Sequence, residues 1–170
     1  RNNMNESISL FDKNSVEDNK IEKEWAQIQI ENAITHKISY IDLSAFERKV
    51  TSQSLKIFVK ELLKTKERHQ IIALALRDQD LGDSCIQELR ELSWLQVLVL
   101  AGNDLSNRSI ELIVQSFPEL VCLSISCNPK ITDIGPLQKL RKLEELLALE
   151  LPLEMIPQDL INLVRNTKIK

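Results

Sequence analysis

The sequence predicts an α/β solenoid with a parallel concave sheet, convex helices and helical caps. Three observations lead to this fold class. Apolar residues recur in one spaced pattern, the pattern returns at a nearly constant interval, and helical spacing appears between the copies. The length of 170 residues fits one domain, and 43% hydrophobic with 28% charged residues is typical of a globular chain.

The spaced pattern is clearest in LQVLVLAGNDL, residues 95–105. In this segment the pattern consists of four leucines and one asparagine: Leu95, Leu98, Leu100, Asn103 and Leu105. Segments 71–81 (IIALALRDQDL) and 120–131 (LVCLSISCNPKI) repeat the spacing, and weaker copies begin at Ile38 and Leu143. The second apolar anchors are residues 41, 74, 98, 123 and 146, so the intervals are 33, 24, 25 and 23 residues. The period is close to constant after a first interval that contains an insertion.

These copies resemble the leucine-rich-repeat family over about residues 38–153. The segment CNPKITDIGPLQKL is similar both to the cysteine-containing, ribonuclease-inhibitor-like class and to the short-repeat class, and both remain open. The resemblance implies a curved solenoid of about five units. Each unit would add one short strand to the concave sheet and a helix or looser segment to the convex side.

The domain organisation follows from this register. We expect residues 1–20 to be disordered or to lie along the surface, because they are polar with few apolar anchors. Residues 21–37 are expected to form an N-terminal capping helix, residues 38–153 the repeats, and residues 154–170 a C-terminal cap and tail.

Helical spacing predicts the segments that flank and join the strands. The expected capping helix buries Ile21, Trp25 and Ile28, and the C-terminal segment 156–166 (IPQDLINLVRN) is expected to be a helix with Pro157 in its first turn. The long helix in segment 52–68 is expected to bury Leu55, Phe58, Val59, Leu62 and Leu63. For the two convex helices that follow it, the candidate N-caps are Asp83 or Ser84 and Ser106 or Asn107.

Amide side chains occur where three of the strands turn away from the sheet. Asn103 and Asn128 hold this position in two repeats, and Gln79 holds it in a third. An amide side chain carries both hydrogen-bond donors and an acceptor. We therefore expect these side chains to satisfy backbone groups of adjacent turns inside the coil.

Strand alternation predicts which residues face outward from the concave sheet. The expected protein-binding residues are Tyr40, Ala73, Ala75, Arg77, Val97, Val99, Cys122, Ser124, Glu145 and Leu147. The centre of this surface is small and apolar, and contiguous apolar patches mark interaction sites. The sequence therefore predicts a non-catalytic protein–protein interaction module, an adaptor or scaffold subunit that binds an apolar segment of another protein chain.

A basic helix face supports a different function. Lys56, Lys60 and Lys64 recur every four residues in the long helix, which predicts one exposed stripe. Such a stripe is a candidate docking site for an acidic partner, and it would suit a ribonucleoprotein or chromatin-associated subunit. A ubiquitin-ligase substrate receptor is a third alternative for a repeat protein of this kind.

Motifs for catalysis and cofactor binding are missing from the sequence. The two histidines have no activating partner nearby in sequence, and the three glycines form neither GxGxxG nor a Walker loop. We therefore expect no enzyme activity, catalytic residue, cofactor or metal. Nucleic acid would be bound only indirectly or through the lysine stripe, and the net charge of −3 does not favour an anionic membrane. Three cysteines without CxxC indicate reduced thiols in an intracellular, nuclear or cytoplasmic protein.

Overall fold

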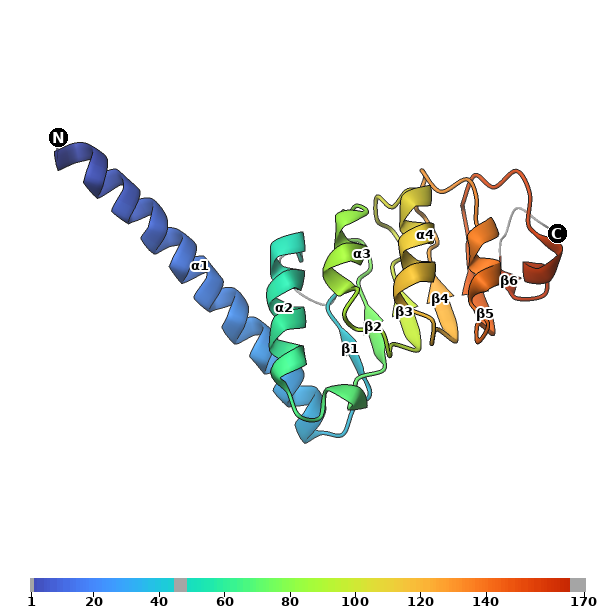
Figure 1. Ribbon diagram of the computed structural model, residues 1–170, viewed down its shortest axis with the longest axis horizontal. Helices are drawn as coiled ribbons and strands as arrows, with labels where there is room; N and C mark the ends of the chain where they lie inside the picture. The colour runs from blue at the N-terminus through green and yellow to red at the C-terminus, as the bar shows by residue number, and fades with distance from the viewer. Residues whose placement is uncertain (1, 45–48, 166–170) are drawn as a thin grey trace.

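A computed structural model describes residues 2–44 and 49–165, with side chains for residues 16–44 and 49–164. Its described strands form a single parallel sheet in which the spatial order equals the chain order. The strands are β1 Tyr40–Asp42, β2 Ala73–Ala75, β3 Val97–Val99, β4 Cys122–Ser124, β5 Glu145–Leu147 and β6 Val164–Arg165. Figure 1 shows them side by side along the body of the molecule. The predicted fold class is confirmed.

Helical segments join the strands on the opposite side of the solenoid (Figure 1). The α-helices are α2 Ser52–Lys64, α3 Ser84–Leu89 and α4 Asn107–Ser116, and the 3-10 helices are η1 Arg68–Gln70, η2 Gly135–Lys139 and η3 Gln158–Leu160. The later units therefore use 3-10 turns where the earlier ones use α-helices. In η2 a proline, Pro136, follows Gly135 in the first turn, and both residues have low helix propensity.

The core lies between the sheet and the helical side. The predicted second anchors of the five repeats are all buried: Ile41, Leu74, Leu98, Leu123 and Leu146. They occupy equivalent positions in neighbouring strands and continue to Val164 of β6. Each unit therefore buries its apolar side against its neighbours, which explains why a single unit would not be stable alone.

The predicted amide ladder is present inside the coil. In Asn103, Oδ1 accepts hydrogen bonds from the backbone N–H groups of Gln79 (3.0 Å) and Leu81 (3.1 Å). Its Nδ2 donates to the carbonyl oxygens of Leu76 (2.7 Å) and Leu100 (3.0 Å). One side chain thus connects two successive turns.

The other two amides have the same role. Oδ1 of Asn128 accepts from the Leu105 N–H at 3.0 Å, while its Nδ2 donates to carbonyl oxygens that include those of Leu100 and Ile125. The longer Gln79 side chain accepts from the Val50 N–H at 2.7 Å. Since buried backbone groups need partners, these amides allow the chain to turn inside the core.

The N-terminal helix α1 Asn2–Thr35 is longer than expected. The expectation of a disordered or surface-lying segment at residues 1–20 is wrong for residues 2–20, which are helical, and residue 1 lies outside the described residues. Neither glycine nor proline occurs in this range, so no residue interrupts the helix. Figure 1 shows the N-terminal part of α1 projecting away from the body, while its C-terminal part lies beside α2.

The buried face of α1 also differs from the expected one. Ile21 and Ile28 are 50% and 61% exposed, whereas the buried residues are Ala26, Ile30 and Ala33. Both sets have helical spacing, so periodicity does not distinguish them. The two alanines let the helix backbone lie close to its neighbours, which is the physical reason why this face docks. Trp25 is half-buried, and its ring lies 6.1 Å from that of Phe58 in α2.

The expected C-terminal helix is absent from residues 156–165. Pro157 instead precedes the 3-10 helix η3, and the chain then forms β6 beside β5. Leu160 is buried, and the Leu163 carbonyl accepts from the Leu146 N–H at 3.1 Å. A sixth strand therefore covers the end of the sheet where a helix was expected, because pairing satisfies the backbone of β5. Residues 166–170 lie outside the described residues.

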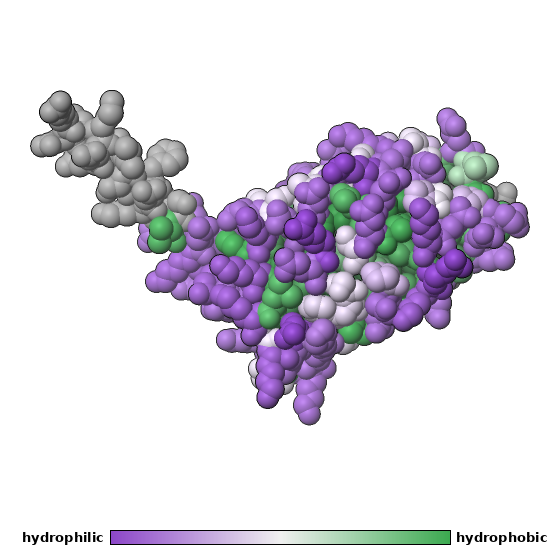
Figure 2. Space-filling view, viewed as in Figure 1, coloured by the Kyte–Doolittle hydropathy of each residue, from purple (hydrophilic) through white to green (hydrophobic). Residues whose placement is uncertain are grey.

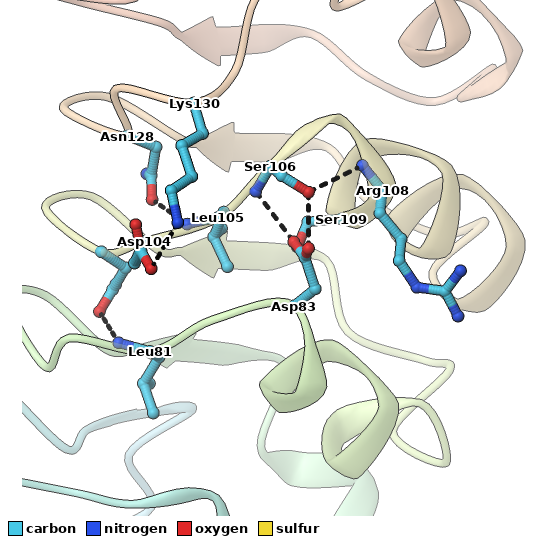
Figure 3. A network of polar contacts seen from close by, with 10 residues as sticks. Leu81, Asp83, Asp104, Leu105, Ser106, Arg108, Ser109, Asn128 and Lys130 are labelled. Carbon is cyan, nitrogen blue, oxygen red and sulfur yellow. Dashed lines mark hydrogen bonds and ion pairs between the residues drawn. The ribbon is translucent and has the colours of Figure 1, made fainter.

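Asp83 connects two turns instead of capping its own helix. It has helical backbone angles and makes no capping hydrogen bond to α3, and Ser84 lies inside that helix. Its carboxylate accepts hydrogen bonds from the Ser106 N–H (2.9 Å) and from the hydroxyls of Ser106 and Ser109, as Figure 3 shows. Ser106 caps α4 as expected by accepting from the Arg108 N–H.

Replacement of Asp83 by asparagine is expected to lower the free energy of unfolding by about 1 kcal/mol at neutral pH. Burial raises the pKa of Asp83, but the hydrogen bonds from Ser106 and Ser109 outweigh it, so the pKa is lowered. A depressed folded-state pKa stabilises the fold above the unfolded-state pKa, and this contribution is lost as pH falls through the folded-state pKa. Urea unfolding at several pH values should show the difference between wild type and Asp83→Asn shrinking with acidification. Exposed Asp18→Asn is the control, and a pH-independent difference would contradict the assignment.

Candidate protein-binding surface on the concave sheet

Two rows of side chains project from the concave side of the sheet. Strand pairing places the first row at equivalent positions of β1 to β5: Tyr40, Ala73, Val97, Cys122 and Glu145. The second row contains Asp42, Ala75, Val99, Ser124 and Leu147. The buried anchors lie between these rows, so the predicted alternation of inward and outward residues is correct.

Exposure varies along the two rows. Tyr40 is 60% exposed, and Val97, Val99 and Leu147 are half-buried. Ser124 departs from the expectation because only 6% of it is exposed. It is small and is paired on either side with larger apolar residues, which limits its access to solvent. Its hydroxyl is therefore a poor candidate for partner contact.

The N-terminal half of this surface contains a hollow of about 240 Å³. Its lining residues come from β1, β2 and β3 and the residues that follow β2: Tyr40, Ile41, Asp42, Ala73, Leu74, Ala75, Arg77, Val97 and Val99. Ala73 and Ala75 are short and lie between the larger side chains of the neighbouring strands. The hollow exists because these two positions hold methyl groups, and it is mainly apolar with a polar edge.

The polar edge of the hollow is held by local hydrogen bonds. Nη1 of Arg77 lies 3.9 Å from Oδ2 of Asp42. Asp42 also accepts from the Ser44 N–H at 2.9 Å, and the Ser44 hydroxyl oxygen accepts from the Arg77 N–H at 2.7 Å. Both charged groups of this pair remain partly exposed. The edge therefore offers one cation and one carboxylate to a partner, next to an apolar hollow.

The thiols of the chain are poorly suited to nucleophilic chemistry. At the other end of the surface, burial raises the pKa of Cys122, and the nearby Glu145 carboxylate raises it further. Burial and the Glu150 carboxylate do the same to the pKa of Cys127, and burial raises the pKa of Cys85 to about 12. Since the thiolate is the reactive form, these environments oppose activation.

The lysine stripe lies apart from the concave surface. Lys56, Lys60 and Lys64 are exposed on α2, which belongs to the helical side. The structure thus brings together the predicted concave residues, but it places the predicted basic residues in a separate location. The hollow itself was not predicted from the sequence. The feature of the sequence that indicates it is the pair of alanines in one strand beside valines in the next strand.

The described part of the chain offers neither a metal site nor a membrane span. Among residues 16–44 and 49–164, no group of three or more His, Cys, Asp or Glu side chains is arranged to hold a metal ion. Within the same part of the chain, no helix combines the length and apolar character needed to cross a bilayer.

Comparison with known proteins supports the architecture. No family model and no curated protein matches the sequence. Among solved structures, internalin C2 from Listeria monocytogenes is similar with a TM-score of 0.56 and 21% identity; the match covers 76% of this chain and 52% of that one. The chain has the leucine-rich-repeat fold. The chain spans about half the length of internalin C2.

A second solved structure matches this leucine-rich-repeat chain to a similar degree. It is the structure of the Chaetomium Mex67:Mtr2 subunits, with a TM-score of 0.55 and 20% identity. The match covers 80% of this chain and 94% of that chain. The leucine-rich-repeat fold is typically a protein-binding module with an extended concave surface. At these levels of identity the comparisons establish the fold.

Proposed function

We propose that this leucine-rich-repeat chain is a non-catalytic interaction module that binds another protein across its concave sheet. The observation that carries the proposal is the apolar hollow beside Val97 and Val99, with Tyr40 exposed at its side. A concave site with apolar lining and few polar groups is the usual form of a binding site. An apolar side chain of the partner would enter the hollow, and Arg77 and Asp42 would orient the segment that carries it.

The energetics require the whole surface to take part. Val97, Val99 and Leu147 are already half-buried, so covering them completely contributes on the order of 3 kcal/mol. Association costs at least about 4 kcal/mol in lost translational and rotational freedom. A stable complex therefore needs the hollow and its polar edge as well as the valines, which favours a partner segment that spans several strands.

An adaptor or scaffold role within a complex is consistent with this mode of binding. The similar fold in the Mex67:Mtr2 structure, which contains two kinds of subunit, supports the use of such a solenoid as a complex subunit. The raised thiol pKa values support a non-catalytic role, because none of the three cysteines is activated.

Glutamate substitution of the two valines tests the proposal. We expect Val97→Glu with Val99→Glu to abolish capture of the partner, because two carboxylates would be desolvated in the interface. The measurement is affinity purification with mass spectrometry, using wild-type chain as reference. Val16→Glu with Ile28→Glu is the matched control, since both residues are exposed on α1 away from the sheet.

A second variant separates binding from folding. Tyr40→Ala removes an exposed side chain beside the hollow without opening the core. It should weaken capture of the same protein while leaving the thermal unfolding curve unchanged. The proposal fails if the folded valine double variant and Tyr40→Ala both capture the same proteins as wild type.

A further inference from the structure

A groove lies between α2 and α3 on the helical side of the solenoid, away from the concave sheet. Its volume is about 620 Å³. Lys56, Lys60 and Lys64 line it from α2 with Val59 and Leu63, and the other side is formed by α3 and the two residues that follow it: Gln87, Glu88, Arg90 and Glu91. Figure 2 shows apolar patches among hydrophilic side chains in the region of α2 to α4. The groove thus has a basic side on α2 and a side of mixed charge on α3, and among the described lining residues four cations outnumber two carboxylates.

Two of the three lysines form no ion pair in the described part of the chain. Lys64 pairs with Glu61 at 3.2 Å, but neither Lys56 nor Lys60 forms an ion pair within residues 16–44 and 49–164. Both side chains are exposed. In a chain with a net charge of −3, this concentration of unpaired positive charge is local. An acidic group placed beside Lys56 and Lys60, on the α2 side of the groove and not on the side of Glu88 and Glu91, would gain attraction without displacing an ion-pair partner.

The same lysines also border a second depression. A hollow of about 260 Å³ lies between α1 and α2, where Lys23 joins them. The three α2 lysines therefore form a ridge with lower surface on both sides. The α2–α3 groove is the larger of the two, and Leu63 is half-buried beside it, so it offers more room and more apolar contact.

We propose that the α2–α3 groove binds an acidic amphipathic helix of another protein. The lysines recur every four residues, so they cover about 12 Å along one helix face. Carboxylates with the same spacing on a helix lying alongside would meet them, and its apolar face would contact mainly the half-buried Leu63, because Val59 is only 5% exposed. Charge complementarity therefore identifies the occupant. The apolar contact at Leu63 favours a peptide over a nucleic-acid backbone, which would use only the charge, and none of the described residues that line the groove is aromatic, as base stacking would require.

Fluorescence anisotropy with a synthetic probe tests the inference on the full chain. The probe is an 18-residue stapled helix with leucines on one face and glutamates at four-residue spacing beside them. It should bind wild-type chain, and Lys56→Glu with Lys60→Glu should weaken binding at least tenfold, because attraction becomes repulsion. Lys139→Glu with Arg141→Glu gives the same change in net charge at exposed sites elsewhere and should leave binding unchanged.

Two comparison probes decide between occupants. The same stapled helix with lysines in place of the glutamates should not bind, and a 20-nucleotide single-stranded RNA should bind more weakly than the acidic helix. Tighter binding of the RNA through the same lysines would overturn the proposal, as would no binding of the acidic helix or equal binding to both double variants.

Because Val97 and Val99 lie on the opposite side of the core, their glutamate variant should bind the acidic helix normally, which keeps this test separate from that of the concave surface.

Discussion

Replacement of Asn128 by alanine is expected to lower the free energy of unfolding by about 2 to 4 kcal/mol. The side chain is completely buried and makes hydrogen bonds to two successive turns. The carbonyl of Leu100 keeps a bond from Asn103 in the variant, but the Leu105 N–H and the Ile125 carbonyl lose their amide partner. Each buried polar group left without a partner costs about 1 to 3 kcal/mol. Urea unfolding followed by circular dichroism measures the change.

Asn162→Ala provides the matched control for this variant. Asn162 is exposed, and substitution at such a surface position usually changes stability by less than about 0.5 kcal/mol. Equal stabilities of the two variants would show that the Asn128 amide does not hold adjacent turns together.

Replacement of Phe58 by alanine should destabilise the N-terminal end of the solenoid by about 3 to 5 kcal/mol. Phe58 is among the largest fully buried side chains, and it contacts Trp25 from α1 as well as the core. Its loss leaves a cavity at the junction of α1 and α2. Denaturant unfolding should show the loss of stability, and Trp25 emission should shift to the red as its surroundings become wetter.

Ile57→Ala tests whether this effect depends on the buried position. Ile57 is the preceding residue of α2 and is half-buried, so its truncation should cost about 1 kcal/mol. If both variants lose the same stability, or if Trp25 emission stays unchanged in Phe58→Ala, then Phe58 does not support the α1 contact.

The sequence predicted the repeating part of the fold because two independent periods agree there. Alternation within a strand separates Leu98 from Val97 and Val99, and the repeat interval places Leu74 and Leu123 beside Leu98. The amide ladder followed from the same register. The two outward rows of the concave surface were therefore predictable, although their role in binding stays a prediction.

The ends of the solenoid were less predictable, because several arrangements satisfy the same local pattern. Two helical stripes of α1 have equivalent spacing, and only packing against α2 selects the one that contains Ala26 and Ala33. At the C-terminal end, the apolar residues of segment 156–164 fit a helix, yet pairing with β5 favours the strand β6. The hollow and the low exposure of Ser124 likewise depend on the sizes of neighbours in adjacent strands.

The matching spatial and chain order of the strands has a consequence for cooperativity. In such a linear array each turn interacts only with the turns before and after it, so separate portions can open independently and at different free energies. A ligand lying across β1 to β5 would contact turns that do not otherwise touch. Such a ligand would couple the opening of distant turns. Binding at the concave surface would therefore slow amide hydrogen exchange in turns far beyond the residues that the ligand contacts.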